Sequence, residues 1–172
     1  GPAAFPDFVT DETEYLDLLF HRNPLLRLQA NNKDVRNLML RARSSTTKFI
    51  EWIADGILKE NPRIVGCSST FEQHVSSLSL LRRIKKLAPD TVTLLGGANC
   101  EAEMGSSTHK YFPWIDIVVS GEADGLVSQL CSLILTHGPD IQPSHLPVGV
   151  FAPHHRANGY PVGEPNGTIS RA

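Results

Sequence analysis

The sequence lacks several patterns that identify common classes of protein. Its 172 residues contain three cysteines and no Cys-x-x-Cys pair. No apolar run approaches the roughly 20 residues that a membrane-spanning helix needs, and no signal-peptide pattern opens the chain. The formal net charge is −2, which argues against a protein that grips nucleic acid mainly through phosphates. A sparse, odd number of cysteines suits a reducing compartment, so we expect a cytoplasmic protein that contacts neither membrane nor nucleic acid.

Motifs for nucleotide, metal and nucleophilic chemistry are missing as well. No Gly-x-Gly-x-x-Gly follows a strand pattern, and no Gly-Lys-Ser/Thr marks a phosphate loop, so nicotinamide and Walker-type nucleotide sites are disfavoured. His154 and His155 are adjacent, and adjacent side chains on a strand point in opposite directions, so we predict no metal site there. Cys100, Glu101 and His109 have no defined catalytic geometry. The sequence therefore predicts no catalytic residue and no metal ligand.

Three apolar runs carry the strongest signal, because each ends in small or polar residues and is followed by a helical pattern. The runs are Arg63–Cys67, Thr91–Leu95 and Ile115–Val119. Alternating strands and helices predict an α/β fold with a small parallel sheet, of the Rossmann-like or flavodoxin-like type. The carboxyl ends of parallel strands share one edge of the sheet, and ligands bind at that edge.

Helical periodicity predicts the remaining elements. N-terminal helices are expected over Asp11–Phe20 and Lys33–Arg43, with a third, capped by Thr46 or Thr47, that ends at Asn61-Pro62. In the α/β part, helices are expected over Glu72–Leu87, Glu101–Tyr111 and Asp124–His137, the first with an inward stripe of Val75, Leu78, Leu81, Ile84 and Leu87.

A weaker strand signal over Val148–Phe151 suggests a hairpin with Tyr160–Val162. We therefore divide the chain into an N-terminal helical segment (1–62), an α/β core (63–137) and a C-terminal hairpin and linker (138–172). No strong strand signal precedes Arg63. Either the helices compensate for a thin sheet, or an opening pair of strands is missing from this sequence. The exposed edge of such a sheet could pair with a second copy of the chain to form a homodimer.

Three stretches of this sequence resemble cobalamin-binding domains attached to radical S-adenosylmethionine enzymes. They are Ile64–Gln73, Gly96–Gly105 and Val118–Asp124, and the Gly-Gly-Ala-Asn-Cys-Glu run is the most specific part. The closest subgroup is that of the maturases of ribosomally made, post-translationally modified peptides. Two family motifs are absent: the Asp-x-His-x-x-Gly that ligates cobalt, and the Cys-x-x-x-Cys-x-x-Cys that holds an iron–sulfur cluster.

The resemblance implies a module that presents a corrinoid to a separate radical domain of a peptide methyltransferase or maturase. The cobalt would carry a methyl group or tune the radical chemistry, while the cluster and S-adenosylmethionine would belong to the neighbouring domain. It also implies that cobalamin lies along the carboxyl edge of the sheet. The residues implied to hold it are Ser68, Ser69 and Thr70 near the nucleotide tail, Gly96, Gly97 and Ala98 beside its base, Gly121 and Glu122 at the pocket floor, and His74 and Asn99 as further contacts.

Other interpretations of these residues stay open at this stage. His74 can equally pack at the start of its helix, Asn99 can cap the helix that follows, and Glu122 can favour a helix N-terminus by its charge. For the chain as a whole, the alternative is an interaction scaffold with a vestigial pocket, whose N-terminal helices dock a peptide substrate or the rest of an enzyme. A free-standing small-molecule enzyme ranks last, because no nucleophile, base or metal constellation is visible.

Overall fold

The computed structural model describes residues 11–161 and divides the chain into two compact units, residues 1–56 and 57–172. The first unit is helical, with α1 (Glu12–Arg22), α2 (Pro24–Arg27) and most of α3 (Lys33–Leu58). Asp11 caps α1, because its side chain accepts a hydrogen bond from the backbone N–H of Glu14 at 2.9 Å. Asn23 caps α2 in the same way, with Pro24 in the first position of the helix.

Helix α3 corrects one prediction, because two helices were expected where the structure has one helix of 26 residues. Thr46 and Thr47 do not cap a new helix. Their hydroxyls donate instead to the carbonyls of Ala42 and Arg43, four residues earlier, so the helix continues through them. The first unit's core is formed by Tyr15, Leu16 and Phe20 of α1, against which Val35, Met39 and Leu40 of α3 pack.

The second unit is a mixed four-stranded sheet with helices on both faces. Its strands are β1 (Ile64–Ser68), β2 (Val92–Gly96), β3 (Ile117–Val119) and β4 (Val150–Phe151), in the order β1-β2-β3-β4. The pairs β1–β2 and β2–β3 are parallel, whereas β4 runs antiparallel to β3. The helices are α4 (Gln73–Leu87), α5 (Ala102–Tyr111), α6 (Val127–His137) and α7 (His154–Asn158), with short 3₁₀ turns at Ala98–Cys100 and Pro143–His145. The predicted α/β class is confirmed.

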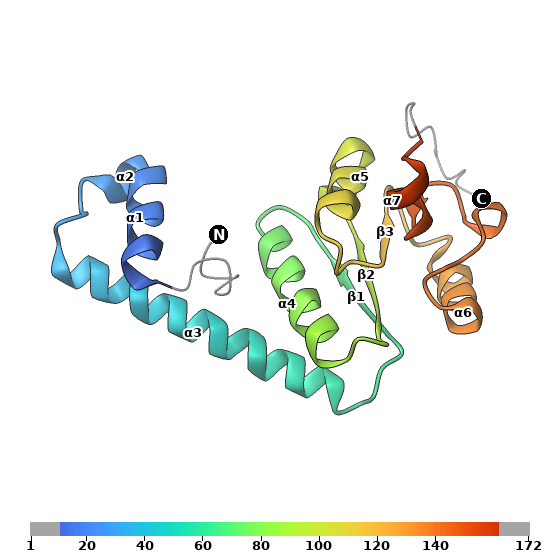
Figure 1. The fold of residues 1–172 in the computed structure, drawn as a ribbon, viewed down its shortest axis with the longest axis horizontal. Helices are drawn as coiled ribbons and strands as arrows, with labels where there is room; N and C mark the ends of the chain where they lie inside the picture. The colour runs from blue at the N-terminus through green and yellow to red at the C-terminus, as the bar shows by residue number, and fades with distance from the viewer. Residues whose placement is uncertain (1–10, 162–172) are drawn as a thin grey trace. The chain divides into compact units, whose positions relative to one another are not determined.

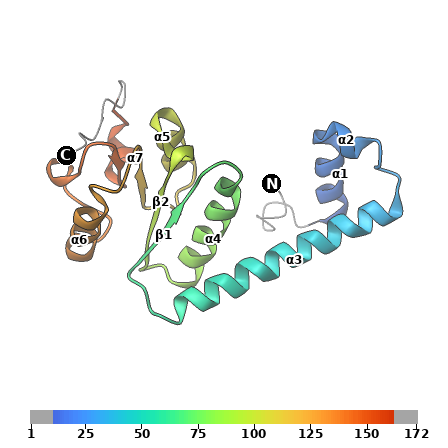
Figure 2. The same ribbon diagram turned by 180° about the vertical axis from the view of Figure 1, so that it is seen from behind.

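The two faces of the sheet are covered by different helices, with α4 and α5 on one face and α6 on the other (Figures 1 and 2). Strand alternation explains this division. Val92, Ile117 and Val119 point to the face where Leu130 and Ile134 of α6 complete one apolar cluster. Burying apolar side chains on both faces is typical of a sheet built from strand–helix–strand crossovers.

Three local predictions about this unit are wrong. The strand at Val150–Phe151 pairs with β3 and not with Tyr160 or Pro161, while Val162 lies outside the described residues. Val75 and Leu87 are 36% and 41% exposed, so they lie outside the buried stripe of α4, which Leu78, Leu81 and Ile84 make up.

A third correction concerns His154 and His155, which open helix α7 and do not lie on a strand. The centroids of their rings lie 3.8 Å apart, and the ring planes are tilted by 38°. Among residues 11–161, no group of three or more His, Cys, Asp or Glu side chains is arranged to hold a metal ion. In the same part of the chain, no helix combines the length and apolar character needed to cross a membrane.

A buried polar cluster joins α4, β2 and β3 near the amino ends of the strands. The Asp116 carboxylate accepts from Lys85 Nζ at 2.7 Å, from the Thr93 backbone N–H at 2.8 Å and from the Thr93 hydroxyl at 3.0 Å. Lys85 Nζ also donates to the carbonyl of Thr91. These bonds fix the register of the strands whose opposite ends carry the candidate site.

Candidate functional site

The candidate site is the carboxyl edge of the sheet, where the loops that follow β1, β2 and β3 meet. The parallel register pairs Ser68 with Gly96 at the ends of β1 and β2. Beyond that pair, the backbone N–H of Ser69 donates to the Gly96 carbonyl at 2.7 Å, and the backbone N–H of Asn99 donates to the Ser69 carbonyl at 3.0 Å. The first two loops are therefore joined directly, backbone to backbone.

Gly97 is required by this contact between loops. Its φ is +93° and its ψ is 176°, a backbone conformation that is essentially restricted to glycine. A Cβ added there would lie 2.7 Å from the Ser69 carbonyl oxygen and 2.8 Å from the Ser69 nitrogen. The space that the sequence suggests for a flat base is thus filled by the backbone of Ser69. Gly96 is less constrained, because its added Cβ would make ordinary contacts with Val119, the nearest at 3.6 Å.

The side chains of the first two loops form one hydrogen-bonded network. The buried Ser69 hydroxyl lies 3.1 Å from His74 Nδ1 and accepts from Asn99 Nδ2 at 3.1 Å. His74 Nε2 lies 3.4 Å from the Thr108 hydroxyl of α5, and burial lowers the pKa of His74. The structure thus brings Ser69, His74 and Asn99 together as predicted, but their polar groups face one another. Thr70 behaves similarly, since its hydroxyl donates to Gln73 Oε1 at 3.0 Å.

Asn99 does not cap the following helix, which was one of its open interpretations. Helix α5 starts at Ala102 with Glu101 in the cap position, and Glu101 makes no capping side-chain bond. The second Asn99 Nδ2 contact is with the carbonyl of Phe71, at 2.9 Å. Asn99 therefore ties the loop after β2 to the turn that precedes α4.

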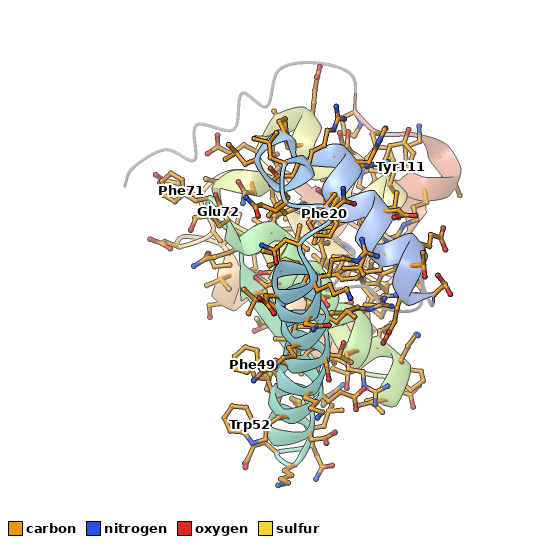
Figure 3. All side chains as sticks on the ribbon, turned by 90° about the vertical axis from the view of Figure 1, so that its left-hand side faces the viewer. Phe20, Phe49, Trp52, Phe71, Glu72 and Tyr111 are labelled. Atoms are coloured by element: carbon orange, nitrogen blue, oxygen red, sulfur yellow. The ribbon has the colours of Figure 1, made fainter. Side chains whose placement is uncertain are left out.

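Phe71 is the feature of this edge that sequence reasoning missed. It has a φ of +46°, which is uncommon for a residue other than glycine, and its side chain is 93% exposed (Figure 3). A residue held in an uncommon backbone conformation, here by the hydrogen bond from Asn99, is typical of functional sites. An aromatic residue in a strand-end loop was a visible signal, but the positive φ was not.

The third loop is more open than the other two. The Ser120 hydroxyl accepts from the backbone N–H of Ala102 at 2.8 Å, which ties β3 to the start of α5. The next residue, Gly121, has a φ of +96°, and no atom lies within 4 Å of a Cβ added there. Glu122 is exposed. Gly121 and Glu122 thus border open space, as a pocket rim or a contact surface would.

Cys100 and His109, which the sequence offers beside Glu101, form no catalytic set. Cys100 is fully buried, and burial raises the pKa of its thiol to about 11. His109 is also fully buried, with Nδ1 2.8 Å from the Tyr160 hydroxyl and Nε2 3.0 Å from the Asp116 carbonyl. Burial, reinforced by the nearby charge of Arg156, lowers the pKa of His109 to about 4. Both groups are neutral near pH 7 and are engaged in packing.

Comparison with known proteins adds no relative: no model of a protein family matches this sequence, and no curated protein matches it either.

Proposed function

We propose that the α/β unit is a cobalamin-binding-type module of a radical S-adenosylmethionine enzyme that modifies ribosomally made peptides. One observation carries the proposal: the three stretches that resemble such modules lie in and after the parallel strands β1, β2 and β3, and their loops meet at one sheet edge. That edge is where open α/β sheets bind ligands. We assign the enzyme to the cytoplasm because all three cysteines are free thiols.

A corrinoid could contact only the solvent-exposed surface of the carboxyl edge, not the space between its loops. A nucleotide tail has no room between Ser69 and Gly97, whose backbones are in contact. The groups still available to a ligand are the exposed Ser68, Ala98 and Glu122 and the open backbone of Gly121. When bound, the cobalt would carry a methyl group or tune the radical chemistry of the neighbouring domain. The chain itself offers a rigid, polar rim and the Phe71 ring beside it.

A hydroxocobalamin titration of the full chain, followed by visible absorbance and calorimetry, tests this proposal. Saturable binding is expected for the wild-type chain. Ala98→Trp should abolish this binding, because Ala98 is exposed in the loop after β2 and an indole there would occupy the space proposed for the corrinoid. Ala157→Trp is the matched control: α7 lies near the amino end of β3, where Arg156 donates to the carbonyl of Ile115. Absence of saturable binding by the wild-type chain would reject a cobalamin function.

An interaction scaffold is the second candidate, and the closed contact between Ser69 and Gly97 favours it. In this case the edge is a preformed docking surface to which the exposed Phe71 ring contributes. The parent enzyme's precursor peptide, or its radical domain, would bind the Ala98→Trp protein when hydroxocobalamin does not. Phe71→Ala should then weaken binding without unfolding the chain, because the ring is 93% exposed.

A further inference from the structure

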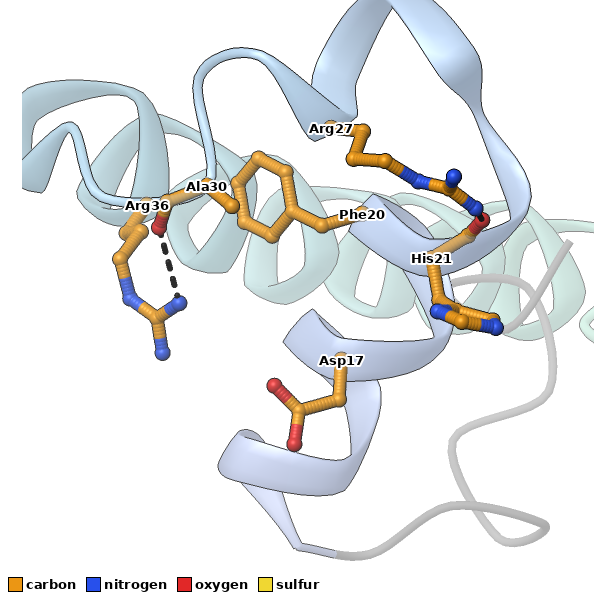
Figure 4. Close-up of a pocket in the computed structure, with 6 residues that line it drawn as sticks. All are labelled: Asp17, Phe20, His21, Arg27, Ala30 and Arg36. Carbon is orange, nitrogen blue, oxygen red and sulfur yellow. Dashed lines mark hydrogen bonds between the residues drawn. The ribbon is translucent and has the colours of Figure 1, made fainter.

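An open cavity of about 590 Å³ lies in the first unit (Figure 4). Helix α1, helix α2, the loop between α2 and α3, and the start of α3 all contribute to its wall. The lining residues are Asp17, Phe20, His21, Arg27, Ala30 and Arg36. Two guanidinium groups, one carboxylate, the His21 imidazole and the Phe20 ring therefore border a single cavity on a small helical unit.

Both arginines are held in place by the backbone. Arg27 Nη2 donates to the His21 carbonyl at 2.9 Å, and Arg36 Nη1 donates to the Ala30 carbonyl at 3.2 Å. The Arg36 guanidinium also lies 5.8 Å from the centroid of the Phe20 ring. Within residues 11–161, neither arginine forms an ion pair with a carboxylate. Each guanidinium has five N–H donors, so several remain for a ligand, and their positions are already fixed.

The third charged group, Asp17, limits what this ligand can be. Arginine pairs well with carboxylate and phosphate groups, but Asp17 in the same cavity repels a small inorganic anion. A peptide satisfies all three groups, because it carries acidic side chains for the arginines and backbone N–H groups for Asp17. Apolar contacts are also available, because Phe20 and Ala30 line the cavity.

We propose that this cavity binds an acidic peptide segment, with one acidic side chain on Arg27, a second acidic side chain on Arg36 and a peptide N–H on Asp17. The inference does not depend on the proposed function of the α/β unit, since every residue it uses belongs to the first unit.

The probe is the capped peptide acetyl-Glu-Leu-Glu-Leu-Glu-amide, with the same peptide carrying Gln for Glu as its neutral control. Titrations of the full chain are followed by calorimetry and by NMR of the arginine Nε–H groups. Arg27→Gln should weaken binding about tenfold or more, because a charge-assisted hydrogen bond is lost. Arg27→Lys keeps the positive charge but loses the planar guanidinium that can donate two hydrogen bonds to one carboxylate, so this variant should weaken peptide binding less. Arg41→Gln removes the same charge from an exposed position of α3 outside the cavity, and should leave binding unchanged.

Asp17→Asn separates a peptide site from a simple anion site. The amide oxygen of this variant still accepts a peptide N–H, whereas the negative charge that repels an anion is gone. Asp17→Asn should therefore strengthen inorganic phosphate by a larger factor than it changes the acidic peptide, and phosphate binds the wild-type chain more weakly than the peptide does. Three results would overturn the proposal: equal losses in Arg27→Gln and Arg41→Gln, equal affinity for the Glu and Gln peptides, or tighter binding of phosphate than of peptide. Circular dichroism of each variant confirms that its helices persist.

Discussion

Replacing Gly97 by alanine should destabilise the α/β unit far more than a surface substitution does. Two costs combine at this position. The backbone conformation, with φ at +93° and ψ at 176°, is strained for any residue with a Cβ, by about 1–3 kcal/mol. The new methyl group would also lie 2.7 Å from the Ser69 carbonyl oxygen, so the loops must separate.

Separation of the loops sets the second cost. It weakens the bonds from the Ser69 N–H to Gly96 and from the Asn99 N–H to Ser69, and each such bond contributes about 1 kcal/mol. We therefore expect Gly97→Ala to lower the free energy of unfolding by about 3–5 kcal/mol in total. Gly121→Ala is the matched control, because Gly121 also has a positive φ of +96° but no atom within 4 Å of the added Cβ. Its expected cost is strain alone, about 1–2 kcal/mol.

Urea denaturation of the full chain, read by amide hydrogen exchange at Leu95 and Val118, follows the α/β unit separately from the N-terminal helices. These two residues are paired in the register of β2 and β3 and are fully buried. Equal destabilisation by Gly97→Ala and Gly121→Ala would refute the reasoning, since the contact with Ser69 would then contribute nothing. A mild effect of Gly97→Ala would show that the loops after β1 and β2 do not contact each other at Ser69 and Gly97.

Three more substitutions test other parts of the fold. Asp116→Asn should lower the free energy of unfolding by about 2–3 kcal/mol because Lys85 loses its carboxylate partner. In a double-mutant cycle, adding Lys85→Met should cost less in the Asp116→Asn background than in the wild-type chain, and additive effects would contradict the pairing. The pKa of His109, lowered by burial to about 4, lies below the value near 6.5 of an unfolded histidine, so stability should be complete above about pH 6.5 and fall as the pH drops toward 4. Denaturation at a series of pH values should show a shallower fall for His109→Gln; parallel curves would rule out His109 as the group responsible. Asn99→Ala should cost about 1–3 kcal/mol and speed amide exchange around Phe71, because two Nδ2 hydrogen bonds are lost; unchanged exchange would show that Asn99 does not hold that turn.

Hydrophobic periodicity was enough to predict the elements of the α/β unit and the edge where its loops meet. The apolar runs that end at Cys67, Leu95 and Val119 became the three parallel strands, because burial on both faces leaves a continuous apolar signal. The pattern could not reveal which way a threonine hydroxyl turns. Thr46 and Thr47 satisfy a cap and an interior helical position equally well, so one long helix was read as two.

The sequence predicted that the three loops share one edge of the sheet, but not the contacts between those loops. The sequence indicates that Gly97 must avoid a Cβ, yet it does not say whether a ligand or another loop occupies the space; the structure puts Ser69 there. The partner of β4 was missed for a related reason, since two residues carry too little pattern to select a neighbour. Phe71 was missed because a positive φ at a non-glycine residue depends on a contact from Asn99, 28 positions away.

The rate at which the buried thiol of Cys100 is alkylated can report how often the loop after β2 opens. The backbone N–H of Cys100 bonds to the Gly97 carbonyl, so Cys100 belongs to the same turn that contacts Ser69. A thiol with a pKa near 11 and no exposed surface reacts with an alkylating reagent only after that turn opens. Alkylation at Cys100, resolved by mass spectrometry from that at the partly exposed Cys67 and Cys131, therefore times the opening, and a ligand bound across the edge would slow it.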